Sequence, residues 1–345
     1  MTPFSSNCLF GKDAFFTLSS YTSDLKKEFN TFSSCSYQSS QKIKKNNKQL
    51  SDFYPPLLGY LFKRITKRIT LPAVKSPSSF GSRLIKESGE WKYKRITVLV
   101  DGLFVDAAIM GRASTLNNKK WVLASIGRTQ TYEKVMTDKT FQSFLKDINS
   151  NVILFNYPNI GASKGTRNTK NMVAAYKGIL EFLEDDKKGI GAKKIIGYGY
   201  SMGGGVQGEA LKTHNFKQDI QYLFIKDRTF SNLRKIFKSY SKGILNDFGS
   251  HFGWSLDSLE SSKRLEQLKI PEIIIQATDE GNNPISDGVI SKNASLKQAA
   301  LTASLQHKTY INFSDHKKNY LHEWTKLSDF SQSLSQKINE LMQTR

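Results

Sequence analysis

Short apolar runs alternate with helical repeats along the chain from about residue 92 onward. Residues 93–110, "YKRITVLVDGLFVDAAIM", form two β-rich runs around Asp101-Gly102, which is a strong signal for a two-residue hairpin turn. Further strands are indicated at 119–127, 151–158, 193–200, 220–227, 271–279 and 308–314. A hairpin followed by strand–helix alternation predicts an α/β fold with a mostly parallel sheet and helices on both faces.

Helical periodicity fills the intervals between several of these strands. Residues 169–186 carry apolar side chains at helical spacing, residues 202–212 open a helix directly after a strand, and a last helix is expected from Thr325 to Met342. Residues 231–268, between two strands, are expected to form a helical cap. The α/β domain is therefore predicted to cover residues 92–345, with the cap inserted in it.

The N-terminal part of the chain has a different character. Residues 1–53 are rich in Ser, Lys, Asn and Gln and are expected to be a flexible arm. Residues 54–91 contain a basic amphipathic segment at 57–70, in which Leu57, Leu61, Ile65 and Ile69 recur every four residues. Such a helix can lie on an anionic membrane surface, or it can pack on the following domain and expose its charges to water.

Charge and cysteine content limit the range of partners. The chain of 345 residues has a formal charge of +21, and residues 1–95 hold 17 Lys/Arg against 6 Asp/Glu. This excess favours an anionic partner, but no nucleic-acid-binding motif is visible, so nucleic acid is not the expected one. Cys8 and Cys35 have no metal-ligand spacing, and we expect neither a metal site nor a cofactor. The sequence also shows no standard secretory signal and no membrane span.

A glycine-rich turn at residues 195–208, "IIGYGYSMGGGVQG", allows two interpretations. A dinucleotide-binding loop would need glycine where Met202 stands, and a phosphate-binding Walker loop would need a Gly-Lys-Ser/Thr ending. Neither requirement is met. Gly199–Gly203 reads G-x-S-x-G between a strand and a helix, which is the context of a nucleophile elbow with Ser201 as the nucleophile.

An acid and a histidine should then follow, each after a later strand. Asp279 comes directly after the strand at 271–279 and is the preferred acid; the alternatives are Glu280, Asp287 and Asp227. His316 lies just past the last strand and is the preferred base. The other histidines are less well placed, and His322 falls within the region after that strand that we expect to be helical.

These motifs resemble the α/β-hydrolase superfamily, and most of all the predicted hydrolases of Chlamydiales known as CHLPS-type proteins. The resemblance covers residues 92–340 and rests on "WVLASIGRTQTYE", "NVILFNYPNIGASKG", "GYGYSMGGG", "IKDRTFSNL" and "FGWSLDSL". It implies a sheet of the eight-stranded type with a small helical cap. Two departures from the family pattern are Asn156 and Asn159, which stand where Asp and Gly are commoner.

The resemblance also implies a chemistry. Backbone amides of Met202 and of the loop containing Gly127 and Arg128 would form the oxyanion hole, while Ser201, His316 and Asp279 would perform acyl transfer on a small-molecule or lipid ester. An esterase or acyl lipase is favoured over a peptidase. The alternative is a non-catalytic hydrolase scaffold that serves as a secreted effector or binding protein. The resemblance allows a virulence-associated protein that is cytoplasmic or exported without a standard signal peptide.

Overall fold

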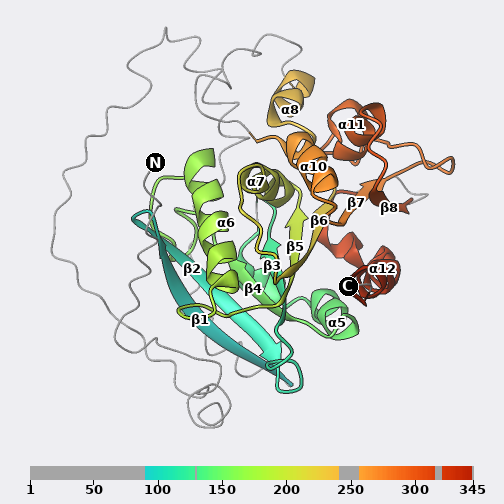
Figure 1. Cartoon of the computed structure of the whole chain (residues 1–345). Helices are drawn as coiled ribbons and strands as arrows, with labels where there is room; N and C mark the ends of the chain where they lie inside the picture. The colour runs from blue at the N-terminus through green and yellow to red at the C-terminus, as the bar shows by residue number, and fades with distance from the viewer. Residues whose placement is uncertain (1–89, 129, 241–255, 315–320, 344–345) are drawn as a thin grey trace, which may run out of the picture.

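The computed structural model describes residues 90–128, 130–240, 256–314 and 321–343 (Figure 1). The predicted arm at 1–53, the basic segment at 57–70 and the middle of the predicted cap lie outside the described residues. Eight strands form one sheet in the order β1-β2-β4-β3-β5-β6-β7-β8. Their bounds are β1 Trp91–Val100, β2 Leu103–Arg112, β3 Lys120–Ser125, β4 Asn151–Phe155, β5 Lys194–Tyr200, β6 Gln221–Asp227, β7 Glu272–Ala277 and β8 Lys308–Phe313.

The sheet is parallel from β4 through β8, and β1 and β2 form an antiparallel edge. The predicted hairpin is confirmed, because Val100 pairs with Leu103 across a two-residue turn. Both turn residues have a positive φ, 47° at Asp101 and 77° at Gly102, as a tight turn between twisted antiparallel strands requires.

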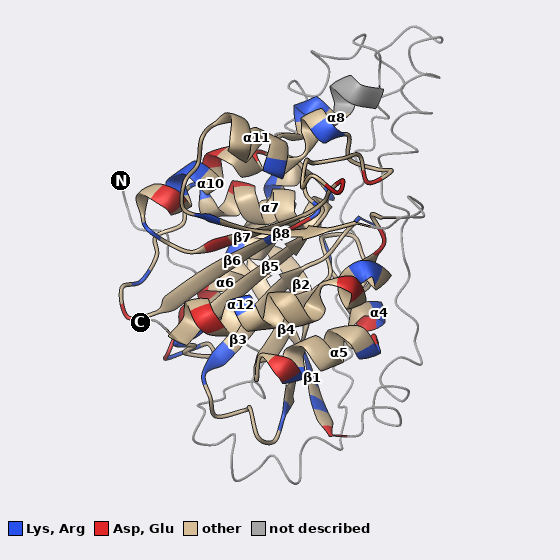
Figure 2. Ribbon diagram, turned by 90° about the vertical axis from the view of Figure 1, so that its right-hand side faces the viewer, with Lys and Arg blue, Asp and Glu red and all other residues tan. Residues whose placement is uncertain are grey.

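Helices cover both faces of the sheet, as the strand–helix alternation predicts. Figure 2 shows α7, α10 and α11 on one side and α4, α5 and α12 on the other. The helices are α4 Tyr132–Met136, α5 Lys139–Asp147, α6 Thr169–Glu184, α7 Met202–Leu211, α8 Leu233–Tyr240, α10 Ser258–Gln267, α11 Leu296–Thr302 and α12 Ser331–Gln343, with 3₁₀ turns η2 Lys292–Ala294 and η3 Trp324–Asp329.

Two apolar clusters fill the space between the sheet and its helix layers. Successive strand residues face opposite sides, so Leu123 and Ile195 belong to the cluster under α6 and α7, and their neighbours Val122 and Ile196 belong to the cluster under α5 and α12. Both faces of the central strands are therefore buried, which explains their nearly continuous apolar sequences.

The observed helices differ from the predicted ones in three places. The short helices α5 and α11 were not anticipated, although Phe141, Phe144 and Leu145 of α5 have helical spacing and are fully buried. The last helix is divided into η3 and α12 at Phe330, whose φ of −135° lies outside the helical region. Across the described parts of the chain, no helix combines the length and apolar character that crossing a membrane demands.

Candidate active site

Ser201 occupies a strained turn between β5 and α7. Its φ of 54° and ψ of −118° lie outside the ordinary regions for a residue with a side chain. The amide of Ser201 donates to the carbonyl of Asp227 (2.9 Å), and the Thr229 hydroxyl donates to the Ser201 carbonyl (2.7 Å). The segment that follows β6 therefore holds the backbone of the turn on both sides of the serine.

The glycines on either side of Ser201 are required by close backbone approach. A Cβ on Gly203 would lie 1.9 Å from the carbonyl oxygen of Ser125, and a Cβ on Gly199 would lie 2.7 Å from the Cα of Gly204. Neither contact can be relieved by rotating a side chain. This is the steric reason for the G-x-S-x-G spacing, and it agrees with the nucleophile-elbow interpretation.

A continuous hydrogen-bond chain leads from Ser201 to a buried carboxylate. Ser201 Oγ lies 2.7 Å from His322 Nε2, and His322 Nδ1 lies 2.7 Å from Asp287 Oδ2. The other oxygen of Asp287 accepts the backbone amides of Val289 (3.0 Å) and Ile290 (2.7 Å). The carboxylate is fully buried, so its orientation is fixed by these partners, and it can hold the imidazole in one tautomer.

The histidine that links Ser201 to Asp287 in this series of hydrogen bonds is His322. It is not the predicted His316, which lies outside the described residues. The prediction rested on proximity to the end of β8 and on the expectation that the region around His322 is helical. The structure corrects the expectation of a helix, since His322 lies in a turn before η3. No signal in the local sequence marks that turn as the one that returns to the serine.

The acid is likewise the alternative Asp287 rather than Asp279. The Asp279 carboxylate is exposed and accepts the amide of Asn283 (2.8 Å), so it caps the turn after β7. Glu280 is exposed in the same turn. Asp227 is buried but is paired with Arg228. The acid therefore comes ten residues after the end of β7, beyond the position that the strand-end rule favours.

The loop after β3 lies against the elbow. Tyr157 donates to the Ile126 carbonyl (3.2 Å) and shares a hydrogen bond with Ser125 (2.7 Å), which anchors the start of the loop. The amide of Gly127 donates to the side chain of Gln130 (3.2 Å) and is therefore used within the loop. The other two predicted oxyanion donors are the backbone amides of Arg128 and Met202. Met202 begins α7, where amides lack intrahelical acceptors.

Two arginines add positive charge beside this loop. Burial lowers the pKa of Arg128, and burial together with the charge of Arg128 lowers the pKa of Arg167 to about 10. Their charges favour negative charge developing in the neighbourhood of the loop.

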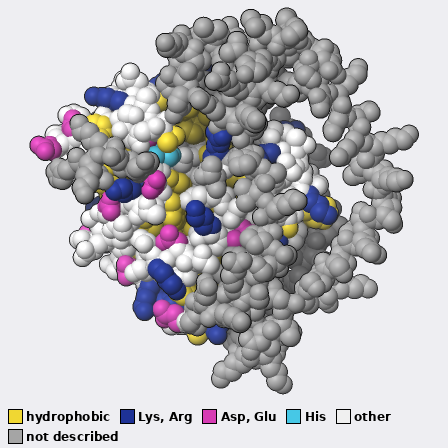
Figure 3. Space-filling view, turned by 180° about the vertical axis from the view of Figure 1, so that it is seen from behind, with side chains coloured by type: hydrophobic (Ala, Val, Ile, Leu, Met, Phe, Trp, Pro, Cys, Tyr) yellow, Lys and Arg dark blue, Asp and Glu magenta, His cyan; other side chains and the backbone are white. Residues whose placement is uncertain are grey.

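Tyr200 and Arg228 surround the histidine turn. The Tyr200 ring stacks on His322 with centroids 5.6 Å apart, and its hydroxyl donates to the His322 carbonyl. Arg228 lies over the Tyr200 ring at 4.9 Å. Burial alone would lower the pKa of Arg228, but the adjacent Asp227 carboxylate raises it above its ordinary value, so the guanidinium stays charged. In the space-filling view, a histidine side chain lies at the surface beside a strip of hydrophobic side chains (Figure 3).

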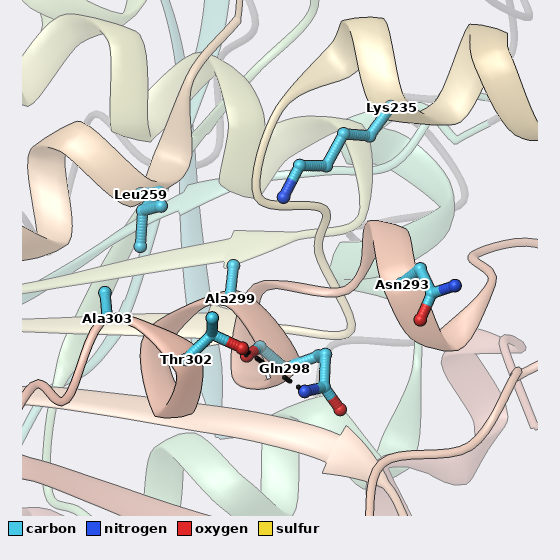
Figure 4. A pocket seen from close by; sticks show the side chains of 7 residues that line it. All are labelled: Lys235, Leu259, Asn293, Gln298, Ala299, Thr302 and Ala303. Atoms are coloured by element: carbon cyan, nitrogen blue, oxygen red, sulfur yellow. Dashed lines mark hydrogen bonds between the residues drawn. The ribbon is translucent and has the colours of Figure 1, made fainter.

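A separate hollow of about 330 Å³ lies among α8, α10, η2 and α11 (Figure 4). Its lining includes Lys235, Leu259 and Gln298, and none of the residues that line it belongs to the Ser201 hydrogen-bond chain. Within the described ranges, no group of three His, Cys, Asp or Glu side chains is arranged to hold a metal ion.

The sheet order, the elbow and the two helix layers define an α/β-hydrolase fold, which confirms the superfamily resemblance. A Vibrio vulnificus α/β hydrolase superposes with a TM-score of 0.56 at 14% identity, covering 82% of this chain and 94% of its own. The Pyrococcus furiosus esterase Pf2001 superposes with a TM-score of 0.54 at 15% identity, covering 79% and 98%. Residues 82–344 match the family described as Chlamydia CHLPS protein (DUF818), and the chain belongs to this family.

A curated relative shares part of the same domain. The α/β hydrolase domain-containing protein aho-3 of Caenorhabditis elegans is 28% identical over 142 residues, which are 41% of this chain and 38% of that protein. The chain thus matches well under half the length of this relative. This relative is also named as an α/β hydrolase, in agreement with the family match, and its name specifies no substrate.

Proposed function

We propose that this protein is a serine hydrolase that cleaves carboxylic esters through Ser201, His322 and Asp287. The observation that carries the proposal is the pair of 2.7 Å contacts that link the serine oxygen, the imidazole and the buried carboxylate in one line. This is the arrangement that activates a serine hydroxyl at neutral pH.

Each residue has a distinct role in the proposed mechanism. His322 Nε2 takes the proton of Ser201 as its oxygen attacks the ester carbonyl, and later returns that proton to the leaving alkoxide. Asp287 keeps the Nδ1 proton of His322 in place and stabilises the imidazolium that forms. A water molecule, deprotonated by the same histidine, then releases the acyl group from Ser201.

The tetrahedral intermediate needs donors for its oxyanion. We assign this role to the backbone amides of Arg128 and Met202, one from the loop after β3 and one from the first residue of α7. The dipole of α7 and the charges of Arg128 and Arg167 add to the stabilisation of that negative charge. Loss of one such donor typically costs ~10²- to 10³-fold in rate.

The proposed mechanism and the names of the relatives support a substrate class. An ester or acyl-lipid bond suits attack by an activated serine, and one structural relative is itself named an esterase. We therefore place carboxylic-ester or acyl-lipid substrates ahead of peptides. Because fold alone does not guarantee chemistry, activity has to be measured on this chain.

Labelling by a fluorophosphonate probe tests the proposal directly. The purified full-length protein is expected to be labelled at Ser201, with labelling abolished in Ser201→Ala. Labelling should fall by ~10³-fold or more in His322→Ala, and should stay close to the wild-type rate in the matched control His316→Ala. A second matched pair distinguishes the acids: Asp287→Asn should lower the rate strongly, and Asp279→Asn should not.

Two results would contradict the proposal. If the folded wild-type protein remains unlabelled and hydrolyses no ester, the non-catalytic scaffold becomes the better description of this protein. If His316→Ala loses labelling while His322→Ala keeps it, the assigned hydrogen-bond chain is not the catalytic one.

A further inference from the structure

Arg228 is a fully buried arginine directly after β6, and no proposed catalytic step uses it. Its Nη1 donates to the carbonyl of Leu321 (3.1 Å) and to the carbonyl of Glu323. These two residues are the neighbours of His322 in the chain. One guanidinium nitrogen thus bridges the carbonyls of the residues on either side of the histidine.

The remaining nitrogens of Arg228 are fixed as well. Nε and Nη2 donate to the two oxygens of Asp227 at 2.7 and 2.9 Å, a bidentate pair whose orientation is further set by the Tyr198 hydroxyl bound to the same carboxylate. A bidentate arrangement restricts rotation of the guanidinium plane. Its donor to the histidine turn is therefore held at a defined position.

Aromatic rings enclose the guanidinium on its remaining sides. Its central carbon lies 4.9 Å from the centroid of Tyr200, 5.5 Å from that of Phe313 and 5.4 Å from that of Phe330. The three rings come from β5, from β8 and from the residue between η3 and α12. Exclusion of water strengthens the hydrogen bonds that Arg228 makes to the histidine turn.

The same segment also holds the nucleophile. The carbonyl of Asp227 accepts the Ser201 amide, and the Thr229 hydroxyl donates to the Ser201 carbonyl. Asp227, Arg228 and Thr229 are consecutive, so three neighbouring residues contact both the serine turn and the histidine turn. The relative position of Ser201 and His322, which are 121 residues apart, is set across this short segment.

We propose that Arg228 is a positioning residue of the active site, which holds the turn of His322 against the Ser201 elbow through its hydrogen bonds to the Leu321 and Glu323 carbonyls. This inference rests on the proposed hydrolase function. In this proposal, Arg228 keeps the His322 imidazole aligned with the hydroxyl of Ser201. A shift of the imidazole by about 1 Å can cost ~10²-fold in rate, so a contact that fixes this turn has a kinetic effect beyond its effect on stability.

The conservative variant Arg228→Lys tests the assignment. Lysine keeps the charge beside Asp227, but its three donors on a single nitrogen cannot keep both the bidentate pair with Asp227 and the two carbonyl contacts of Arg228. With a p-nitrophenyl ester as substrate, we expect kcat to fall about 10- to 100-fold and KM to change less than about 3-fold. The fluorophosphonate labelling rate should fall by the same factor as kcat.

Arg264→Lys provides a matched control. Arg264 also donates to two backbone carbonyls, those of Leu211 and His214, and also lies over an aromatic ring, that of Phe216 at 5.5 Å. It takes no part in the site. Its lysine variant should lose thermal stability to a similar extent and keep the wild-type kcat.

A spectroscopic measurement separates alignment from activity. The proton between His322 Nδ1 and Asp287 should give a downfield ¹H NMR resonance in the wild-type protein, which His322→Gln removes and thereby assigns. We expect this resonance to be lost or broadened in Arg228→Lys and retained in Arg264→Lys. Because the hydrogen bond exists in the resting protein, this result is informative even if no ester is turned over and the proposed function fails.

The inference is overturned if Arg228→Lys keeps both its kcat and its downfield resonance. It is also overturned if Arg228→Lys and Arg264→Lys lower kcat equally, since the effect would then follow from stability alone. If the wild-type protein shows the resonance but no turnover, the proposed function fails, and the resonance in Arg228→Lys alone decides the positioning role.

Discussion

Ser201 shows how much of the site depends on single backbone positions. The residue adopts a φ of 54°, a conformation that costs on the order of 1–3 kcal/mol for a residue with a side chain. The cost is offset by hydrogen bonds to both peptide groups of the serine and by the absence of side chains at Gly199 and Gly203. The strain presents Oγ to His322.

Gly203→Ala should therefore disturb the nucleophile more than its size suggests. The added methyl would meet the Ser125 carbonyl at 1.9 Å, and the elbow can move only by breaking its hydrogen bonds. We expect a loss of ~2–4 kcal/mol in unfolding free energy and loss of probe labelling, measured by urea denaturation and fluorophosphonate reaction. Gly281→Ala is the control, since its methyl would meet only side-chain atoms, those of Asn283 at 3.0 Å and Asp279 at 3.4 Å. Full labelling of the folded Gly203 variant would contradict this account.

Asn156 shows how neighbouring elements share one buried polar network. It follows β4, and its amide nitrogen donates to Glu133 of α4 (3.1 Å) and to Asp106 of β2 (3.5 Å), while its oxygen accepts the Tyr132 amide. The two carboxylates are nearly inaccessible to solvent. An aspartate, which the family resemblance leads us to expect here, would place a third carboxylate in this network, so the departure to Asn has an electrostatic reason.

Asn156→Asp is expected to lower the unfolding free energy by ~2–4 kcal/mol at pH 7, because the new carboxylate would be buried beside two others and would lose two donated hydrogen bonds. Like charges and burial would raise its pKa. The deficit relative to wild type should therefore shrink as pH falls and that group binds a proton. Urea denaturation at pH 7 and pH 5 measures both effects. Asn159→Asp, an exposed position with a φ of 65° that Asp also tolerates, should change little.

A buried charge cluster ties together several elements of the whole fold. Lys226 of β6, Glu272 of β7 and Lys308 of β8 have no exposed side-chain surface. Lys308 lies 3.1 Å from Glu272, whereas Lys226 lies 3.8 Å from it and donates to Ser261 of α10. Burial lowers the pKa of Lys226 from 10.5 to about 8. Glu272 thus faces both ammonium groups, and Lys308 has a second carboxylate, that of Glu266, at 3.9 Å. The free-energy cost of burying a charge therefore falls mainly on Lys226.

The sign of the pH effect follows from that direction. The folded pKa is below the unfolded one, so the cost of protonating buried Lys226 is fully present below about pH 8 and disappears as pH rises toward 10.5. Lys226→Met should be more stable than wild type at pH 7, with Glu272 still paired to Lys308. The advantage should decline at pH 9.5. Urea denaturation at the two pH values tests this, and an advantage independent of pH would contradict it.

Local sequence was sufficient for the features that depend on neighbouring residues. The hairpin at Asp101-Gly102, the strands with their apolar runs and the elbow at Ser201 each follow from a short stretch whose backbone preferences and spacing are decisive. The parallel sheet with helices on both faces follows from the order of those elements.

The partners of Ser201 depend instead on where the chain goes after it leaves the sheet. Asp287 and His322 lie ten and nine residues past the ends of β7 and β8, and several acids and histidines fit such intervals. Contacts distant in sequence select among them: Arg228 binds the carbonyls beside His322, and Tyr200 stacks on its ring. Spacing along the chain identifies Ser201 as the proposed nucleophile, whereas only side-chain packing between distant segments brings His322 and Asp287 to it.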